Sequence, residues 1–240
     1  MTDVSGLGTI LGVWAHPDDE TYLSAGLMAT AASGGARVAC ATATRGEEGS
    51  WDHERYPPSE IGKIREAELT AALGVLGVSE HYWLEFRDGT CDAVDEAEGI
   101  DRVKAIIEKV SPDTVLTFGP EGLTGHPDHS AVSRWTSKAF DVAAKPGASL
   151  CYATSTPEWA AEFVPILNSF TEVFAPGLPP TTPADELEIG FRLTGELADL
   201  KLRALKEQIS QFEPFLQHFG EDSARGFIGT EDFALAHKKD

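Results

Sequence analysis

The chain has 240 residues, with 39 acidic and 19 basic side chains and a formal net charge of -20 at pH 7. Nucleic acids and anionic membrane surfaces are bound by basic patches, so this charge argues against both as partners. With 42% hydrophobic and 24% charged residues, the composition is that of a folded globular domain and excludes a disordered chain.

The sequence also indicates a compartment. Residues 1–6 contain no basic region followed by an apolar one, which argues against a secretion signal. No apolar run approaches the length of a membrane span. Cys40, Cys91 and Cys151 form no C-x-x-C pair, and Cys40 and Cys151 lie in apolar runs typical of buried free thiols. We therefore expect a cytoplasmic protein; a monomer and a homo-oligomer are both compatible with the sequence.

The first predicted strand, residues 9–15, is apolar throughout and leads into His16-Pro17-Asp18-Asp19-Glu20. Proline is well tolerated in the first turn of a helix, so we expect Asp18 and Asp19 in the first turn of a helix over 20–34. His16 and Asp19 are three positions apart, which places them on one helical face and suits a metal ion. The alternative is that these acids only cap the helix, and for Glu20 we favour capping.

A strand is predicted over 37–43, followed by a long polar loop over 44–58. Loops of this length are usually functional or mobile. Trp51 and Tyr56 in this loop could stack on a sugar ring, although such residues more often pin a loop. The next elements are a helix over 59–76, a strand over 81–84, a helix over 101–110 and a strand over 114–118.

A second motif, Gly125-His126-Pro127-Asp128-His129, follows the strand over 114–118 and opens a helix over 127–144. A further strand is predicted over 149–154. This alternation predicts a single α/β domain with a Rossmann-like, mostly parallel sheet flanked by helices. Because the carboxyl ends of parallel strands lie along one edge, both motifs should face the same crevice.

Beyond residue 155 the pattern weakens, although we assign residues 1–240 to one domain. The proline-rich stretch 176–183 cannot be regular helix or interior strand, so we expect a surface loop there, at the rim of the cleft. A late strand is predicted over 187–193 and a closing helix over 195–212.

These motifs resemble those of the PIG-L/LmbE-like family of metal-dependent de-N-acetylases, which carry A-H-P-D-D-E after the first strand and H-x-D-H after a later one. The shorter matches are Thr44-Arg45-Gly46-Glu47-Glu48-Gly49, Arg65 with Glu68, Arg87-Asp88-Gly89, and Lys201, Ala204-Leu205 and Ser210-Gln211. The chain departs from the family at Gln208, where many members have histidine.

The resemblance implies a zinc site, or ferrous iron in the cell, with His16, Asp19 and His129 as ligands. Zinc commonly takes three such protein ligands in catalytic sites. By the same resemblance Asp18 is the general base, kept ionised by the nearby cation. His126 is the protonated group that stabilises the oxyanion, and Asp128 hydrogen-bonds a histidine.

The resemblance further places Glu47, Arg65 and Asp88 around the substrate, with Arg65 as a fork donor. Arg65 and Glu68 also fit an ordinary ion pair on a helix face. The implied activity is hydrolysis of the acetyl group from the amino group of an N-acetylated amino sugar or glycoside.

Two alternatives are also compatible with the sequence. One is a magnesium-binding receiver-type signalling module, which would be shorter and would give no role to the histidines. The other is a related hydrolase acting on another acyl-amide. Mycothiol or bacillithiol precursors, chitooligosaccharide-like sugars and antibiotic glycosides all fit the same core. Selectivity is expected in residues 45–58, 88–99 and 155–185.

Overall fold

Residues 3–240, which the computed structural model describes, build a seven-stranded sheet in the order β3-β2-β1-β4-β5-β7-β6. The first five strands in this order run parallel, and β7 runs antiparallel to both of its neighbours. The strands are β1 (Ile10–Trp14), β2 (Val38–Thr42), β3 (Glu80–Trp83), β4 (Thr114–Phe118), β5 (Ser149–Thr154), β6 (Ile189–Arg192) and β7 (Thr230–Lys238). The predicted mostly parallel α/β sheet is confirmed.

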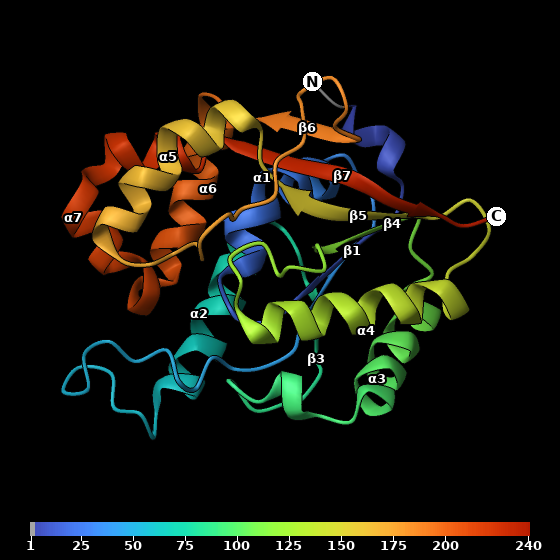
Figure 1. The fold of residues 1–240 in the computed structure, drawn as a ribbon, viewed down its shortest axis with the longest axis horizontal. Coiled ribbons are helices and arrows are strands. Elements are labelled where there is room, and N and C mark those ends of the chain that lie inside the picture. The colour runs from blue at the N-terminus through green and yellow to red at the C-terminus, as the bar shows by residue number, and fades with distance from the viewer. Residues whose placement is uncertain (1–2) are drawn as a thin grey trace.

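Helices cover both faces of the sheet (Figure 1). Helices α3 and α4 pack against each other, while α1 contacts α6 and α6 contacts α2. Helices α5, α6 and α7 gather at one side of the molecule in Figure 1. The helices are α1 (Asp19–Ser33), α2 (Ile61–Val75), α3 (Glu96–Val110), α4 (Pro127–Ala143), α5 (Pro157–Phe170), α6 (Glu196–Glu207) and α7 (Ile209–Phe227), with short 3₁₀ turns at Val4–Leu7 and Cys91–Ala93.

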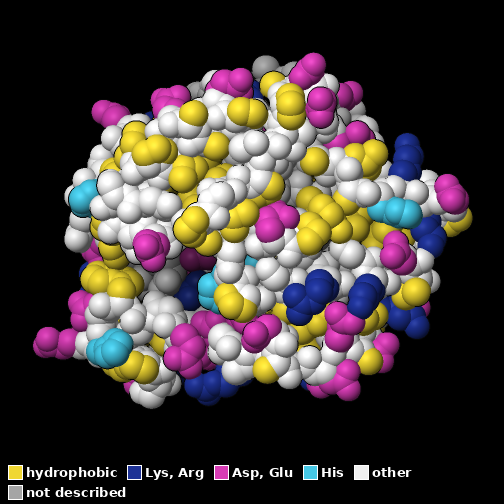
Figure 2. Space-filling view, viewed as in Figure 1, with side chains coloured by type: hydrophobic (Ala, Val, Ile, Leu, Met, Phe, Trp, Pro, Cys, Tyr) yellow, Lys and Arg dark blue, Asp and Glu magenta, His cyan; other side chains and the backbone are white. Residues whose placement is uncertain are grey.

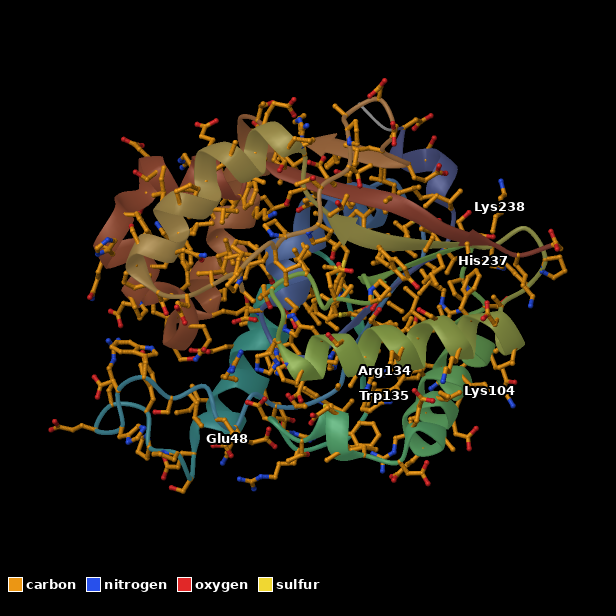
Figure 3. The ribbon with its side chains drawn as sticks, viewed as in Figure 1. Glu48, Lys104, Arg134, Trp135, His237 and Lys238 are labelled. Carbon is orange, nitrogen blue, oxygen red and sulfur yellow. The ribbon has the colours of Figure 1, made fainter. Side chains whose placement is uncertain are left out.

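Close packing between α3 and α4 depends on a small residue. Trp135 of α4 is 1% exposed and extends toward α3 (Figure 3). A Cβ atom at Gly99 of α3 would lie 2.3 Å from the Trp135 ring, so only glycine permits this approach.

The structure confirms the five predicted parallel strands and the helices between them, with α3 beginning at Glu96 rather than at residue 101. It adds α5, which the sequence pattern did not reveal. The predicted closing helix over 195–212 breaks at Gln208 and continues as α7. The added strand β7 then inserts between β5 and β6, so the C-terminal segment completes the main sheet.

A buried ion pair ties this C-terminal segment to α1. Lys201 of α6 and Glu231 of β7 have fully buried side chains, with Nζ and Oε1 2.9 Å apart. Lys201 also donates to the carbonyl of Tyr22, and Glu231 accepts the backbone N–H groups of Gly26 and Leu27. In a regular helix the N–H of Gly26 would donate to the carbonyl of Tyr22. Here Glu231 accepts that N–H and Lys201 donates to that carbonyl, so the ion pair is inserted between two backbone groups of α1.

Two further expectations concern the cysteines and the membrane-spanning segments. Cys40, Cys91 and Cys151 are free and buried. Within residues 3–240, none of the helices combines the length and the apolar character needed to cross a membrane. Acidic side chains are spread over the face shown in Figure 2, with fewer Lys and Arg side chains among them.

We expect Lys201→Ala to lower the free energy of unfolding by about 3–5 kcal/mol, because it leaves the Glu231 carboxylate buried without its cation. Denaturant unfolding followed by circular dichroism measures this loss. Lys206→Ala on the same helix is the matched control, since its pair with Glu221 is about 37% and 49% exposed and should contribute at most about 1 kcal/mol. Equal losses for the two variants would contradict the importance of the buried pair.

Candidate metal centre and active site

The two histidine–aspartate motifs lie at the carboxyl ends of β1 and β4. These strands are neighbours in the sheet although they are distant in sequence, so the strand order changes direction between them. Open α/β sheets form their ligand crevices at such a switch point. His16 precedes α1 and His129 lies in the first turn of α4, and their ring nitrogens approach to 3.1 Å. The predicted convergence of the motifs is confirmed.

Three side chains here present donor atoms to a common point. Nδ1 of His16 and Nε2 of His129 are 3.1 Å apart. The Asp19 carboxylate lies 3.7 Å from the first atom through Oδ2 and 3.5 Å from the second through Oδ1. Donors on a tetrahedral zinc with bonds of about 2.0–2.1 Å are separated by roughly 3.3–3.4 Å. The spacing of these three buried groups therefore fits one small divalent cation.

His129 is prepared to act as a neutral nitrogen donor. Its Nδ1 lies 3.0 Å from the carbonyl oxygen of Gly122, an acceptor that fixes the proton on Nδ1 and leaves the lone pair on Nε2. Burial lowers the pKa of His129 to about 4. Its ring also stacks on Phe118, with ring centroids 4.1 Å apart, so the direction of Nε2 is fixed by packing as well.

Two carboxylates lie beside Nε2, the second ring nitrogen of His16. Nε2 lies 3.0 Å from Asp88 and 3.4 Å from Asp128. Burial alone would lower the pKa of His16, but Asp128, Asp88 and Asp19 raise it to about 10. The surroundings thus favour a positive charge on this ring, and a metal at Nδ1 would supply one in place of a proton.

This arrangement differs from the expected roles of Asp88 and Asp128. We expected Asp88 at the substrate, but this residue is 6% exposed and its carboxylate also accepts the backbone N–H of Glu48. The carboxylate of Asp128 accepts the N–H groups of Gly89 and Cys91 as well as facing His16. Both acids are therefore positioned to orient the His16 ring.

Asp18 lies beside the donor atoms in an unusual backbone conformation. We expected it in the first helical turn, but it precedes α1 with φ 112° and ψ -31°. A positive φ at a non-glycine residue is strained, and such strain persists where the surroundings impose it. Burial raises the pKa of Asp18 to about 7, while the Arg65 guanidinium lowers it.

Arg65 imposes part of that conformation. Nη2 donates to the carbonyl of Pro17 at 2.6 Å and lies 3.2 Å from Oδ2 of Asp18. Nη1 donates to the carbonyl of Gly46, whose φ is +68° and where a Cβ would lie 2.1 Å from the guanidinium. Arg65 is 5% exposed. We expected its guanidinium group to donate to the substrate, but the group faces Asp18 and the main chain instead.

Sequence reasoning missed the role of Gln208. Its Nε2 donates to Oε1 of Glu20 at 2.7 Å, and both side chains are buried. The other oxygen of Glu20 accepts the backbone N–H of Asp18, which supports the capping role favoured for Glu20. The only signal in the sequence was the departure from histidine at this position. From the break between α6 and α7, Gln208 thus supports the turn that carries Asp18, through Glu20, which lies 188 residues before it.

The loop over residues 45–58 is held to neighbouring segments. Glu47 was expected to contact substrate, and its carboxylate accepts the backbone N–H groups of Arg45 and Asp88. Trp51 donates to the carbonyl of Ser210, and Gln211 donates to the carbonyl of Gly49. Glu48 lies at the outer edge of the loop, where it pairs with exposed Arg87 (Figure 3). These contacts favour pinning over sugar stacking for Trp51.

His126 is exposed and lies next to the buried histidines, with its ring centroid 4.7 Å from that of His16. Its Nδ1 accepts the backbone N–H of Asp128 at 3.2 Å, which places the proton of the neutral ring on Nε2. Asp128 therefore orients His126 through its main chain rather than through its carboxylate. Although the residue is exposed overall, partial burial of its ring, followed by the charge of His16, lowers the pKa of His126, so the structure does not favour the imidazolium form that we expected.

Ligand atoms of His16, His126 and His129 also lie within 4.8 Å of one another, as do those of His16, Asp88 and Asp128. The second set surrounds Nε2 of His16 rather than Nδ1. The first set would require a fourth protein ligand beside Asp19, which leaves zinc less room for water and substrate.

The chain is similar to a known protein family and to several named proteins. Residues 11–140 match the family described as "PIG-L: GlcNAc-PI de-N-acetylase". A protein named 1D-myo-inositol 2-acetamido-2-deoxy-alpha-D-glucopyranoside deacetylase from Mycobacterium sp. (strain KMS) is 37% identical over 155 residues, which cover 56% of this chain and 50% of the relative. A relative of the same name from Salinispora arenicola (strain CNS-205) is 30% identical, with 98% of this chain and 88% of the relative covered.

The chain spans about half the length of several of these curated relatives. Among solved structures, N,N'-diacetylchitobiose deacetylase from Pyrococcus horikoshii is similar with a TM-score of 0.66 and 21% identity, covering 98% of this chain and 87% of that one. This likeness shows the fold. The receiver-type alternative is not favoured, since imidazole nitrogens at the centre of the site do not suit magnesium.

We propose that His16, Asp19 and His129 hold one divalent metal ion, and we expect His129→Ala to lose most of the metal bound per chain because it removes one of three donors. Elemental analysis of the purified protein measures the metal content. His53→Ala, which removes an exposed loop histidine, is the matched control and should keep the full content. An unchanged content in His129→Ala would exclude this residue as a ligand.

Proposed function

The chain belongs to the PIG-L family, and from that premise we propose that it is a metal-dependent hydrolase that removes the acetyl group from an N-acetylated amino sugar or glycoside. The convergence of His16 Nδ1, Asp19 and His129 Nε2 supports this proposal most directly. Beside those donors lie the imidazole of His126 and the carboxylate of Asp18. These are the groups that hydrolysis of an amide requires.

We propose zinc as the metal, with ferrous iron as the alternative in the cell, because two imidazoles and one carboxylate suit either ion. When bound, such an ion polarises a carbonyl oxygen and lowers the pKa of water from about 15.7 to about 7. Three protein donors leave coordination positions open for this chemistry.

The three buried free thiols accord with a reducing compartment, and we propose a cytoplasmic enzyme.

Asp18 would act as the general base. It is adjacent in sequence to the donor Asp19, has a positive φ, and its carboxylate is held by Arg65. In hydrolysis, Oδ1 or Oδ2 of Asp18 takes a proton from the attacking water as the new C–O bond forms. The same carboxyl can then return a proton to the amide nitrogen as the C–N bond breaks. The products are acetate and a free amine.

His126 would stabilise the negative charge that develops on the carbonyl oxygen. With Nδ1 occupied by the backbone N–H of Asp128, its Nε2–H is the group available to donate into the crevice. A fixed donor of this kind acts without the reorganisation that water would require. The neutral tautomer is sufficient for this role.

The substrate class follows from the family and from the relatives named as deacetylases of an acetamido-glucopyranoside of inositol. The test is release of free amine from a panel of N-acetylated glucosides, including an inositol glycoside and chitooligosaccharides. Protein loaded with zinc or with ferrous iron should release amine, and chelator-treated protein should not. Equal rates with and without metal would exclude the proposed mechanism.

We expect Asp18→Asn to keep its metal and its fold but to lose turnover by about 10²–10⁴-fold, since it removes only the proton acceptor. Asparagine tolerates positive φ about as well as aspartate, so the backbone strain is not a confounding change. Steady-state kinetics, elemental analysis and thermal unfolding together check this outcome. Turnover near that of the wild type would place the base elsewhere.

We expect His126→Ala to lower kcat by about 10²–10³-fold with unchanged metal content, because it removes a donor to the oxyanion. His126→Gln restores a neutral N–H donor and should recover part of that loss. Metal content separates this role from ligation. If His126→Ala loses its metal as His129→Ala is expected to, then His126 is a ligand and the proposed role is wrong.

A further inference from the structure

A cavity of about 320 Å³ adjoins the proposed metal site. Asp19 and His129 form part of its wall, so it begins at the reacting centre. Most of the remaining wall comes from aromatic and aliphatic side chains of α1, β4, α5, α7 and the segment after α5. They include Leu23, Phe118, Trp159, Phe174, Phe215 and Phe227.

The charged groups in this wall are already paired. Glu231 is bound to Lys201 and to the backbone of α1. Asp232 accepts from Arg192, with Nη1 and Oδ1 2.9 Å apart. The hydroxyl of Thr154 donates to the carbonyl of Pro180. Polar side chains such as Tyr22, Thr171 and Gln211 also reach this wall, but most of its surface is apolar. The wall therefore favours an apolar group over a ligand rich in hydroxyl groups.

The polar parts of the site lie elsewhere. Asp18 and His126 are absent from the described residues that line the apolar cavity. His126 instead borders a second cavity of about 490 Å³, whose wall includes Thr124, Asn168 and Glu172. An amide has an acyl side and an amine side, and the departing amine must receive a proton. The amine side therefore belongs near Asp18 and His126, which leaves the acyl side for the apolar cavity.

We propose that the apolar cavity binds an acyl chain longer than acetyl, so that the preferred substrate is an amino sugar N-acylated with about six to eight carbons. This inference rests on the proposed hydrolysis and specifies its acyl specificity. A methyl group is about the size of a water molecule, whose share of liquid volume is about 30 Å³, so acetyl would leave most of the cavity unfilled. The bond changes are unaltered: the C–N bond breaks, the C–O bond forms, and a longer carboxylate leaves.

The first experiment varies only the acyl group. Glucosamine bearing N-acetyl, N-butyryl, N-hexanoyl or N-octanoyl is incubated with zinc-loaded protein, and kcat/KM is obtained from free amine release. Each buried methylene contributes about a fourfold gain. We expect N-hexanoyl to exceed N-acetyl by at least tenfold. Amine release that is fastest from N-acetyl would overturn the acyl-chain proposal while leaving the proposed deacetylation intact.

A pair of variants tests where the preference arises. Leu23 lies one helical turn after Asp19, and Leu23→Trp should fill the cavity and reduce the hexanoyl-to-acetyl ratio at least tenfold. Leu235→Trp is the matched control, because Leu235 is 44% exposed on β7 and lines none of the cavities described above. Its ratio should equal that of the wild type. A ratio that is unchanged in a folded Leu23→Trp protein would place the acyl chain elsewhere.

A binding measurement that requires no turnover distinguishes the acyl-site proposal from the hydrolysis proposal. Calorimetry with the wild-type protein compares sodium hexanoate and sodium acetate, and we expect hexanoate to bind at least tenfold more tightly. If no substrate releases amine but hexanoate shows this preference, the hydrolysis proposal fails and the acyl site stands. Equal affinities for the two carboxylates would overturn the acyl site, whether or not Leu23→Trp folds.

Discussion

The central constraint on this structure is the concentration of acidic side chains at one edge of the sheet. Asp19, Glu20, Asp88 and Asp128 are buried and Asp18 is half-buried, and they lie in the turns after β1 and β3 or in the first turns of α1 and α4. Carboxylates in such surroundings require cations or hydrogen-bond donors, since an unpaired buried charge is very unfavourable. Arg65, the His16 ring and several backbone N–H groups meet part of this need. A divalent ion between His16, Asp19 and His129 would meet the rest.

The sequence predicted the framework of the site well because that framework is local. Apolar strands followed by polar turns identified β1 and β4, and the parallel sheet then required their turns to meet. The partner of each side chain could not be predicted in the same way. Whether Asp88 faces a sugar or His16, and whether Arg65 faces solvent or Asp18, depends on how separate loops pack. Motif spacing contains no information about that packing.

The C-terminal third was harder to predict for a related reason. Strand β7 contains Glu231 and Asp232, which read as exposed residues in sequence but are buried against Lys201 and Arg192. Helix α5 contains Pro165, which normally argues against a helix interior. In both cases tertiary partners outweigh the local pattern. The same segment supplies Gln208 to the turn of Asp18 and several walls of the apolar cavity.

The insertion of β7 between β5 and β6 has a consequence for dissecting the protein. A fragment ending after β5 would still contain every proposed metal donor and Asp18. It would also expose one whole edge of β5, a hydrogen-bonding surface that invites self-association. Glu20 would lose Gln208, and the α1 backbone would lose its partners Lys201 on α6 and Glu231 on β7. Residues 11–140 and the C-terminal segment therefore depend on each other structurally, and exchanging segments between relatives should preserve Lys201, Gln208 and Glu231 together.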